Sequence, residues 1–283
     1  MVERRGTRGV LAHVIAMLGV LIVAFPVYLA FVASTHTAQE IVQAPMPLLP
    51  GDNIVYSYKS ALFGRETAAG SNAPVAHMMW VSLVTALVIS FGKITISLLS
   101  AFAIVYFRFP LRKTFFWAIF ITLMLPVEVR ILPTYKVLAD LNLLNTYAGL
   151  TVPLIASATA TFLFRQFFMT VPDELVEASR IDGAGPFRFF WDTLLPLSRT
   201  NMAALFVILF IYGWNQYLWP LLITTRDEMQ TIVIGIKKMI VTADAITEWQ
   251  LVMATAMLAM LPPVAVVVLM QRLFVRGLVE TEK

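Results

Sequence analysis

Residues 79–107 read MWVSLVTALVISFGKITISLLSAFAIVYF, an apolar stretch that contains one charged residue, Lys93. About 20 consecutive apolar residues in a helix are enough to cross the hydrocarbon core of a bilayer. The stretch is continuously apolar, whereas a strand of a membrane barrel alternates between apolar and polar residues. It therefore predicts an all-α integral membrane protein.

Five further stretches of the same character lie on either side of it. The six predicted transmembrane helices cover 11–33, 79–107, 114 to between 127 and 132, 147–168, 202–223 and 251–274. The composition agrees, because only 13% of the residues are charged and 59% are hydrophobic, whereas a soluble domain has about 25% charged residues. We expect a transmembrane domain over 11–275, with tails at 1–10 and 276–283.

The first stretch follows Arg4 and Arg5, as the apolar segment of a signal peptide does. It is longer than the roughly 7–15 apolar residues of such a segment, so we expect it to stay in the protein. Lys and Arg are nearly twice as frequent in the loops on the side of the N-terminus as in the opposite loops. Because cytoplasmic loops carry the excess of basic residues, both termini are predicted to be cytoplasmic.

Two connections are longer than the others. The outer loop 35–76 is rich in Pro, Gly and Ser and gives only weak signs of a packed domain. The cytoplasmic loop 170–200 has strong helical signals. Pro172 suits a first helical turn, Asp173 and Glu174 suit the positive end of the helix dipole, and Gly183 suits a helix end.

A second short helix is predicted over 187–193, closed by Pro196. The first helix carries small and apolar residues on one side, namely Leu175, Ala178, Ser179 and Ile181. Exposed faces of this kind usually bind a partner. The pattern leaves two interpretations open: a hairpin that docks on another protein, and an amphipathic hairpin that lies on the bilayer.

The order Glu177-Ala178-Ser179-x-x-x-Gly183, followed by Leu195-Pro196, resembles the EAA loop of the permeases of ATP-binding-cassette importers. Ile181-Asp-Gly-Ala184 resembles the centre of that motif. Ser179 and Thr193 depart from it, where the family usually has alanine and an aliphatic residue. The segments 98–110, 126–130 and 212–220 resemble the sugar-type permeases, so the likeness extends along nearly the whole chain.

The resemblance implies that the 173–196 loop is a coupling helix that docks in a groove of an ATPase subunit. The implied coupling residues are Glu174, Glu177, Ala178, Ser179, Asp182, Gly183, Ala184 and Pro196. Glu177 would pair with an arginine of the ATPase, although a local pair with Arg180 is an alternative. Gly183 would make the turn, and Ala178 and Ser179 would be small because the ATPase packs on them.

The resemblance also implies the setting of the chain. It would lie in a bacterial inner membrane with a sister permease, two ATPase subunits and a periplasmic solute-binding protein. ATP and Mg would be bound by the ATPase subunits, with no cofactor in this chain. Within the family the likeness is greatest to permeases for sn-glycerol 3-phosphate or related glycerophosphodiesters.

Ionisable residues at membrane depth are functional candidates. Lys93 would either face the solute pathway and attract an anion, or pack and snorkel at an interface. Glu128 and Arg130 lie between Pro126 and Pro133, two prolines expected to break the helix. Arg130 would contact a phosphate, or else pair with Glu128 or with a lipid headgroup.

Polar and aromatic residues are also dense in 212–219. Tyr212, Asn215 and Gln216 are candidates for the pathway or for contact with the sister subunit, because amides at membrane depth need partners. Tyr217 and Trp219 would instead suit the aromatic belt at the membrane surface.

Other classes of protein fit less well. The chain has no cysteine, its three histidines have no metal-ligand spacing, and it contains neither a G-x-x-x-x-G-K-[ST] loop nor an H-E-x-x-H motif. We therefore expect no metal, no catalytic residue and no nucleotide site in this chain, and no nucleic-acid partner. A standalone ion-coupled secondary carrier is the alternative function, but such carriers bury carboxylates, and here only Glu128 approaches membrane depth.

Overall fold

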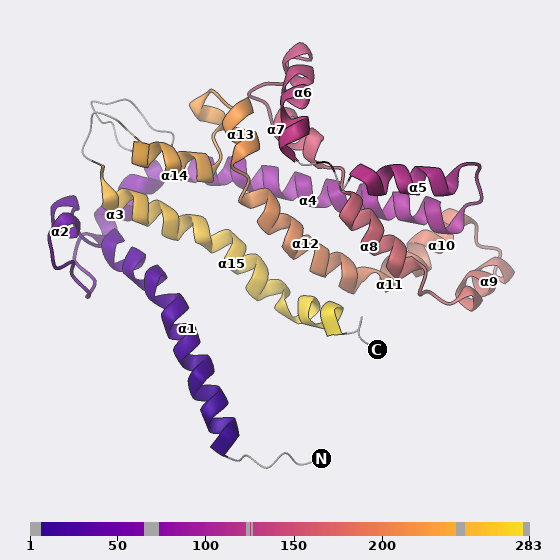
Figure 1. The fold of residues 1–283 in the computed structure, drawn as a ribbon, viewed down its shortest axis with the longest axis horizontal. Coiled ribbons are helices and arrows are strands. Elements are labelled where there is room, and N and C mark those ends of the chain that lie inside the picture. The colour runs from indigo at the N-terminus through magenta and orange to yellow at the C-terminus, as the bar shows by residue number, and fades with distance from the viewer. Residues whose placement is uncertain (1–6, 65–73, 123–124, 126, 242–246, 280–283) are drawn as a thin grey trace. The chain divides into compact units, whose positions relative to one another are not determined.

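The computed structural model describes residues 7–64, 74–122, 125, 127–241 and 247–279, and within these ranges the chain is helical, without a strand (Figure 1). The predicted all-α class is confirmed. The chain divides into two compact units. One comprises Met1–Ala76 and Gly235–Met260, and the other comprises His77–Ile234 and Leu261–Lys283.

The first unit starts with α1 (Thr7–Ser34), followed by α2 (Ala38–Val42) and α3 (Ile54–Phe63). It also contains most of α14 (Ile232–Val241) and the first part of α15 (Trp249–Val279). The apolar side chains of α1 are exposed along most of the helix. In water such a surface would be unfavourable, so it requires lipid or another protein.

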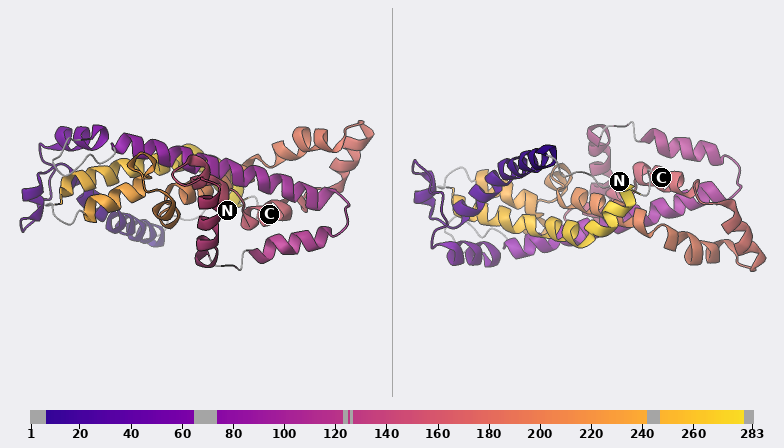
Figure 2. Two further views of the ribbon diagram at one scale, coloured as in Figure 1. Left: turned by 90° about the horizontal axis from the view of Figure 1, so that it is seen from above. Right: turned by 90° about the horizontal axis from the view of Figure 1, so that it is seen from below.

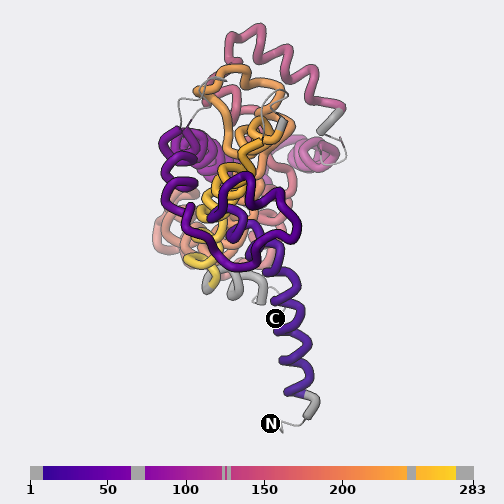
Figure 3. Tube along the Cα trace, turned by 90° about the vertical axis from the view of Figure 1, so that its left-hand side faces the viewer, coloured from indigo at the N-terminus to yellow at the C-terminus, as the bar shows by residue number. Residues whose placement is uncertain are grey.

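The outer loop has more structure than its sequence indicates. Residues 35–64 form α2, α3 and the compact turns that connect them at the C-terminal end of α1, which Figure 3 shows in indigo and purple. The Thr35 carbonyl accepts from the Asn53 N–H at 2.9 Å, and the Tyr28 hydroxyl donates to the Leu48 carbonyl at 2.7 Å. Thr37 and Glu40 form a capping box on α2. The Thr37 backbone N–H, aided by the His36 side chain, lowers the pKa of Glu40.

The second unit contains the remaining helices. They are α4 (Val75–Tyr106), α5 (Arg112–Ile121), α6 (Val127–Asp140), α7 (Tyr147–Thr151), α8 (Ala158–Phe168), α9 (Asp173–Ile181), α10 (Pro186–Phe189), α11 (Leu195–Leu197), α12 (Arg199–Trp214) and α13 (Leu218–Ile223). The chain reverses after α4, so that α5 runs back beside it (Figure 2). α4 also lies beside α12, with the rings of Phe91 and Phe206 5.2 Å apart.

A buried cluster joins the end of α4 to α8, to the segment that follows α9, and to α12. Its members are Ile94, Leu98, Ala101, Phe102, Ala160, Phe164, Phe168, Phe189, Phe190, Leu194, Leu205 and Leu209. Phe102 and Phe190 pack with ring centroids 4.9 Å apart. The cluster fixes the 170–200 segment to the transmembrane helices, so movement of this segment would be transmitted to α4 and α12.

Among the described residues, three helices are long and apolar enough to cross a membrane: Gly9–Ser34, Val75–Tyr106 and Trp249–Gln271. The number is up to five if each of two bent pairs of helices is one span. Tyr147–Leu154 and Ala158–Phe168 meet at 47°, and Pro186–Leu197 and Arg199–Trp214 meet at 70°. The count of six stays a prediction, because the third predicted span falls partly on residues 123, 124 and 126, which lie outside the described residues.

The predicted span over 147–168 is a bent pair of helices rather than one continuous helix. α7 ends at Thr151, a 3₁₀ turn covers Val152–Leu154, and α8 begins at Ala158. Pro153 provides no N–H for a regular helix at this point. The Ser157 hydroxyl then accepts from the Ala160 N–H at 3.2 Å and caps the new helix.

The predicted helix over 202–223 is also interrupted. α12 ends at Trp214 with Asn215 as its C-terminal cap, and α13 starts at Leu218. Pro220 sits in the first turn of α13, where its missing N–H leaves no acceptor unpaired. The break places Trp219 in the protein interior, where its indole N–H donates to the Gly149 carbonyl at 3.1 Å. The alternative that Trp219 belongs to an interfacial belt is therefore wrong.

Gly149 is expected to be intolerant of any side chain. A Cβ there would collide with the carbonyl oxygen of Leu143, a backbone atom that cannot rotate away. Because overpacking of this kind costs about 1–3 kcal/mol, Gly149→Ala should lower the thermal unfolding midpoint of the purified chain. Gly19→Ala is the matched control, since nothing lies within 4 Å of a Cβ at that position. Equal midpoints for the two variants would contradict the close contact.

Candidate functional site

The hairpin of residues 172–198 is built by local signals that act as expected. Pro172 precedes α9 in an extended conformation, and Asp173 and Glu174 occupy the first turn. At the other end Gly183 has a φ of 72°. The Ala184 N–H donates to the Ser179 carbonyl at 2.9 Å and the Gly183 N–H to the Arg180 carbonyl at 3.0 Å. These two bonds form a Schellman motif, so the predicted helix end is confirmed.

The second half of the hairpin differs from the predicted helix 187–193. α10 covers Pro186–Phe189, a π-helical turn covers Phe190–Leu194, and α11 continues to Leu197. The prediction that Pro196 closes the helix is wrong. Pro196 lies in the first turn of α11, where a proline needs no N–H. The segment ends at Ser198, whose hydroxyl donates to the Leu194 carbonyl at 2.6 Å.

The hairpin has one apolar surface that is packed and another that is open. Phe189, Phe190 and Leu194 are buried in the core cluster, and Val176 packs against it. A second set of large apolar side chains is exposed, namely Leu175, Ile181, Phe187 and Trp191, with Ile181 at 86% of its full exposure. These four exposed side chains are not part of the core cluster that packs the hairpin against the rest of the chain.

The predicted coupling residues lie along this hairpin. Glu174, Glu177, Ala178, Asp182 and Gly183 are exposed, whereas Ser179 and Ala184 are half-buried. Ser179 and Ala184 line a groove of about 130 Å³ beside Phe102 and Tyr106 of α4. Within the described residues Glu177 forms no ion pair, so the local pair with Arg180 is absent. The Glu177 carboxylate is open to a partner.

Lys93 lies in the second half of α4 and only 7% of its surface is exposed. Its ammonium nitrogen sits 3.9 Å from the ring centroid of Tyr212 on α12, a cation–π contact. In the described part of the chain no carboxylate pairs with Lys93. The structure thus brings together Lys93 and Tyr212, two candidates that are far apart in the sequence.

The helix that carries Arg130 is not broken as predicted. α6 continues through Pro133, and the Thr134 hydroxyl donates to the Arg130 carbonyl at 2.7 Å. Side-chain hydroxyls such as that of Thr134 can pair with backbone carbonyls where a proline interrupts the hydrogen bonds of a helix. The Arg130 side chain is exposed. Pro126 and the Glu128 side chain lie outside the described residues, so a pair between Glu128 and Arg130 stays untested.

Within the part of the chain that the structure describes, the side chains of the two amides that follow α12 form no hydrogen bond with another helix. Asn215 is exposed, and Gln216 is half-buried with its side-chain amide donating to the Tyr212 carbonyl at 3.1 Å. Tyr212 is exposed beyond its contact with Lys93. The described residues contain no cluster of His, Cys, Asp and Glu that could hold a metal ion.

A connection that the sequence did not predict joins the turn before α7 to the residues that follow α13. Asn145 adopts a φ of 55°, and its side-chain oxygen accepts from the backbone N–H groups of Thr225 at 2.7 Å and Arg226 at 2.9 Å. The only sequence signal is the asparagine itself, which tolerates the left-handed conformation better than most residues.

The long apolar helices are those of an integral membrane protein, and the hairpin adds an open apolar face that a partner or lipid would cover. Residues 93–280 match the family model described as binding-protein-dependent transport system inner membrane component. The match covers more than half of the chain, and the chain belongs to this family. It is accordingly a multi-pass inner-membrane permease of the ATP-binding-cassette type, as the resemblance implied.

Curated relatives cover the chain from end to end. It is 62% identical to the sn-glycerol-3-phosphate transport system permease protein UgpE of Brucella melitensis biotype 1 over 100% of both chains. The identity is 63% with the protein of that name from Agrobacterium fabrum and 58% with that from Yersinia enterocolitica, again over 100% of both chains.

One solved structure shares the fold. A chain in the crystal structure of a bacterial ABC transporter involved in the import of the acidic polysaccharide alginate aligns with a TM-score of 0.76 and 21% identity. The alignment covers 96% of this chain and 99% of that one.

Proposed function

We propose that this chain forms half of the translocation pathway of an ATP-driven importer for sn-glycerol 3-phosphate or related glycerophosphodiesters. The observation that carries the proposal is identity of 58–63% over the full length of relatives named as permeases for that solute. A lysine held in the interior, with no carboxylate partner among the described residues, supports an anionic solute.

The proposed complex contains a sister permease, two ATPase subunits and a periplasmic solute-binding protein. ATP and Mg would be bound by the ATPase subunits, because this sequence has no phosphate-binding loop. The open apolar face of the hairpin and the exposed α1 give this chain two surfaces that a complex or lipid would cover.

The proposed coupling element is the hairpin around α9. Its exposed Leu175, Ile181 and Phe187 would enter a groove of the ATPase, and the free Glu177 carboxylate would pair with an arginine there. The positive φ of Gly183 supports this role, because it allows a tight turn at the tip of the hairpin. The packed face of the hairpin would pass movement of the ATPase to α4 and α12 through the core cluster.

The proposed solute path runs past Lys93, Tyr212 and Arg130. Lys93 and Arg130 are both cations, and a path lined by cationic side chains attracts an anionic solute. A phosphate monoester offers oxygens to both an ammonium and a guanidinium group. Asn215 and Gln216 follow Tyr212 at the end of α12 and would extend the polar lining.

The proposed topology has six spans and both termini in the cytoplasm. The chain contains no cysteine, so single cysteines can be placed without a background. Arg188→Cys in the hairpin is expected to react with a membrane-impermeant maleimide only in inverted vesicles. Asp52→Cys in the outer loop should react only in intact spheroplasts. Labelling of both positions from one side would contradict the topology.

The function is tested by ATP hydrolysis in the purified complex, reconstituted with its binding protein. We expect the binding protein loaded with sn-glycerol 3-phosphate, or with a glycerophosphodiester, to stimulate hydrolysis above the level given by the unloaded protein. Addition of neutral maltose to the binding protein should give no such stimulation. Stimulation by maltose and none by either phosphate ester would overturn the substrate.

A further inference from the structure

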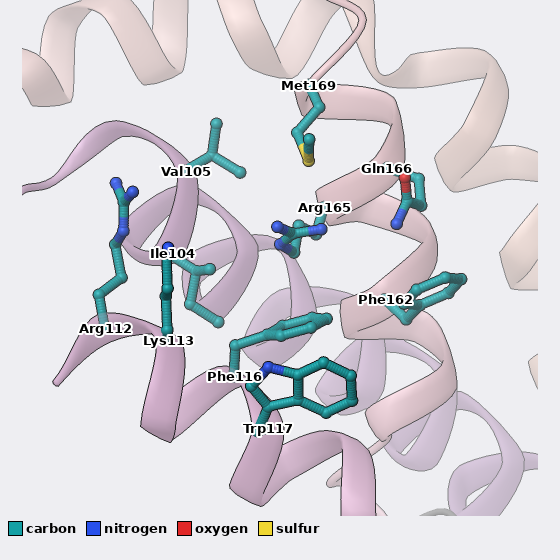
Figure 4. A pocket seen from close by; sticks show the side chains of 10 residues that line it. All are labelled: Ile104, Val105, Arg112, Lys113, Phe116, Trp117, Phe162, Arg165, Gln166 and Met169. Atoms are coloured by element: carbon teal, nitrogen blue, oxygen red, sulfur yellow. The ribbon is translucent and has the colours of Figure 1, made fainter.

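A cleft between α5 and α8, at the end of α4, has no role in the function proposed above. Its volume is about 600 Å³. Figure 4 shows Arg112 and Lys113 of α5 and Arg165 of α8 around its opening, with the rings of Phe116, Trp117 and Phe162 beneath them. The cleft thus has a cationic layer above an aromatic layer.

The cationic layer lacks a counter-charge. No aspartate or glutamate lines the cleft, and within the described residues none of the three cations forms a salt bridge. The Nε atom of Arg165 is buried and has no hydrogen-bond acceptor there. The Arg165 guanidinium lies 4.3 Å from the ring centroid of Phe116, which holds it in place. An unpaired buried donor is unfavourable, so an acceptor is expected to enter the cleft.

The position of the cleft indicates what kind of acceptor it binds. The cations lie where apolar helices end, since α4 stops at Tyr106, α5 begins at Arg112 and α8 stops at Phe168. Further along α5, Phe115, Trp117 and Ile121 expose more than half of their surfaces. Basic residues followed by exposed aromatic and apolar residues mark the boundary between lipid headgroups and acyl chains.

We propose that this cleft binds the phosphate headgroup of an anionic phospholipid, on the same side of the membrane as the hairpin. The planar Arg165 group offers two parallel N–H donors to phosphate oxygens, and Arg112 and Lys113 balance the remaining charge. The aromatic layer packs against the glycerol backbone and the first methylenes of the acyl chains. A free phosphate ion would use the cations but leave the aromatic layer without a partner.

The test is native mass spectrometry of the purified importer complex, titrated in parallel with phosphatidylglycerol, phosphatidylcholine and inorganic phosphate. Lys113→Gln removes one exposed charge, and Arg112→Gln with Arg165→Gln removes two. The control replaces two exposed cations elsewhere, Lys59→Gln with Lys136→Gln. Copurification of the ATPase shows that each variant is assembled.

The wild-type complex should retain phosphatidylglycerol in preference to phosphatidylcholine. Each basic residue near an anionic headgroup adds roughly fivefold to such a preference, so Lys113→Gln should reduce it about fivefold and the double variant about 30-fold. The control should leave it unchanged. Equal retention of the two lipids, equal binding in all variants, or displacement of the lipid by millimolar phosphate would overturn the proposal.

Discussion

Glu177→Ala is expected to abolish ATP-dependent uptake by the reconstituted importer and to weaken the association of the ATPase with this chain. The carboxylate is exposed and has no ion pair among the described residues, so its removal leaves the fold of this chain intact. Truncation of one member of a buried interface pair costs about 2–5 kcal/mol. The ATPase affinity should therefore fall roughly 30-fold or more.

The matched control for this prediction is Asp192→Ala on the same hairpin. Asp192 is also exposed, and its partner is Arg188 of this chain at 3.2 Å. An exposed pair at this spacing contributes only a few tenths of a kcal/mol, so the variant should keep wild-type uptake and ATPase association. If both variants lost uptake and ATPase association, or if both variants kept them, Glu177 would not have its proposed role.

Lys93→Met is expected to reduce the rate of sn-glycerol 3-phosphate uptake at saturating binding protein. A hydrogen bond to a charged group contributes about 1.5–3 kcal/mol, which corresponds to a loss of roughly 10- to 150-fold. Methionine keeps the length of the side chain and its packing in α4. The variant is expected to copurify with its partners at wild-type levels.

Two further variants separate charge from packing at this site. Lys93→Arg keeps a cation beside the Tyr212 ring and should recover part of the uptake. Tyr212→Phe keeps the ring face and should remain close to wild type, because the ring face provides the attraction. Wild-type uptake by Lys93→Met would show that the lysine is a packing residue, which is the other interpretation that its sequence position left open.

Structural features that depend on residues close together in the chain could be predicted from the sequence. The start of α9 after Pro172 and its end at Gly183 depend on residues within one or two turns. The apolar spans at 11–33, 79–107 and 251–274 were visible because length and composition define them. The compact turns at 35–64 were not, since they depend on single hydrogen bonds such as that from Tyr28 to Leu48.

Structural features that depend on contacts between residues far apart in the chain could not be predicted from the sequence. The break between α12 and α13 depends on Trp219 reaching the Gly149 carbonyl, a contact between segments far apart in the chain. The pairing of Lys93 with Tyr212 likewise required the packing of α4 on α12. Pro133 was expected to break a helix because prolines often do, but it lies in the middle of α6, and the neighbouring Thr134 hydroxyl donates to the Arg130 carbonyl.

The central claim is that this chain is the solute-translocating partner of an ATPase. Its most direct test is uptake of labelled sn-glycerol 3-phosphate by liposomes that contain the complete importer, external loaded binding protein and internal ATP. We expect accumulation that requires ATP, the binding protein and this chain together. Accumulation by liposomes that contain this chain alone, without the ATPase, would contradict that claim and favour an independent carrier.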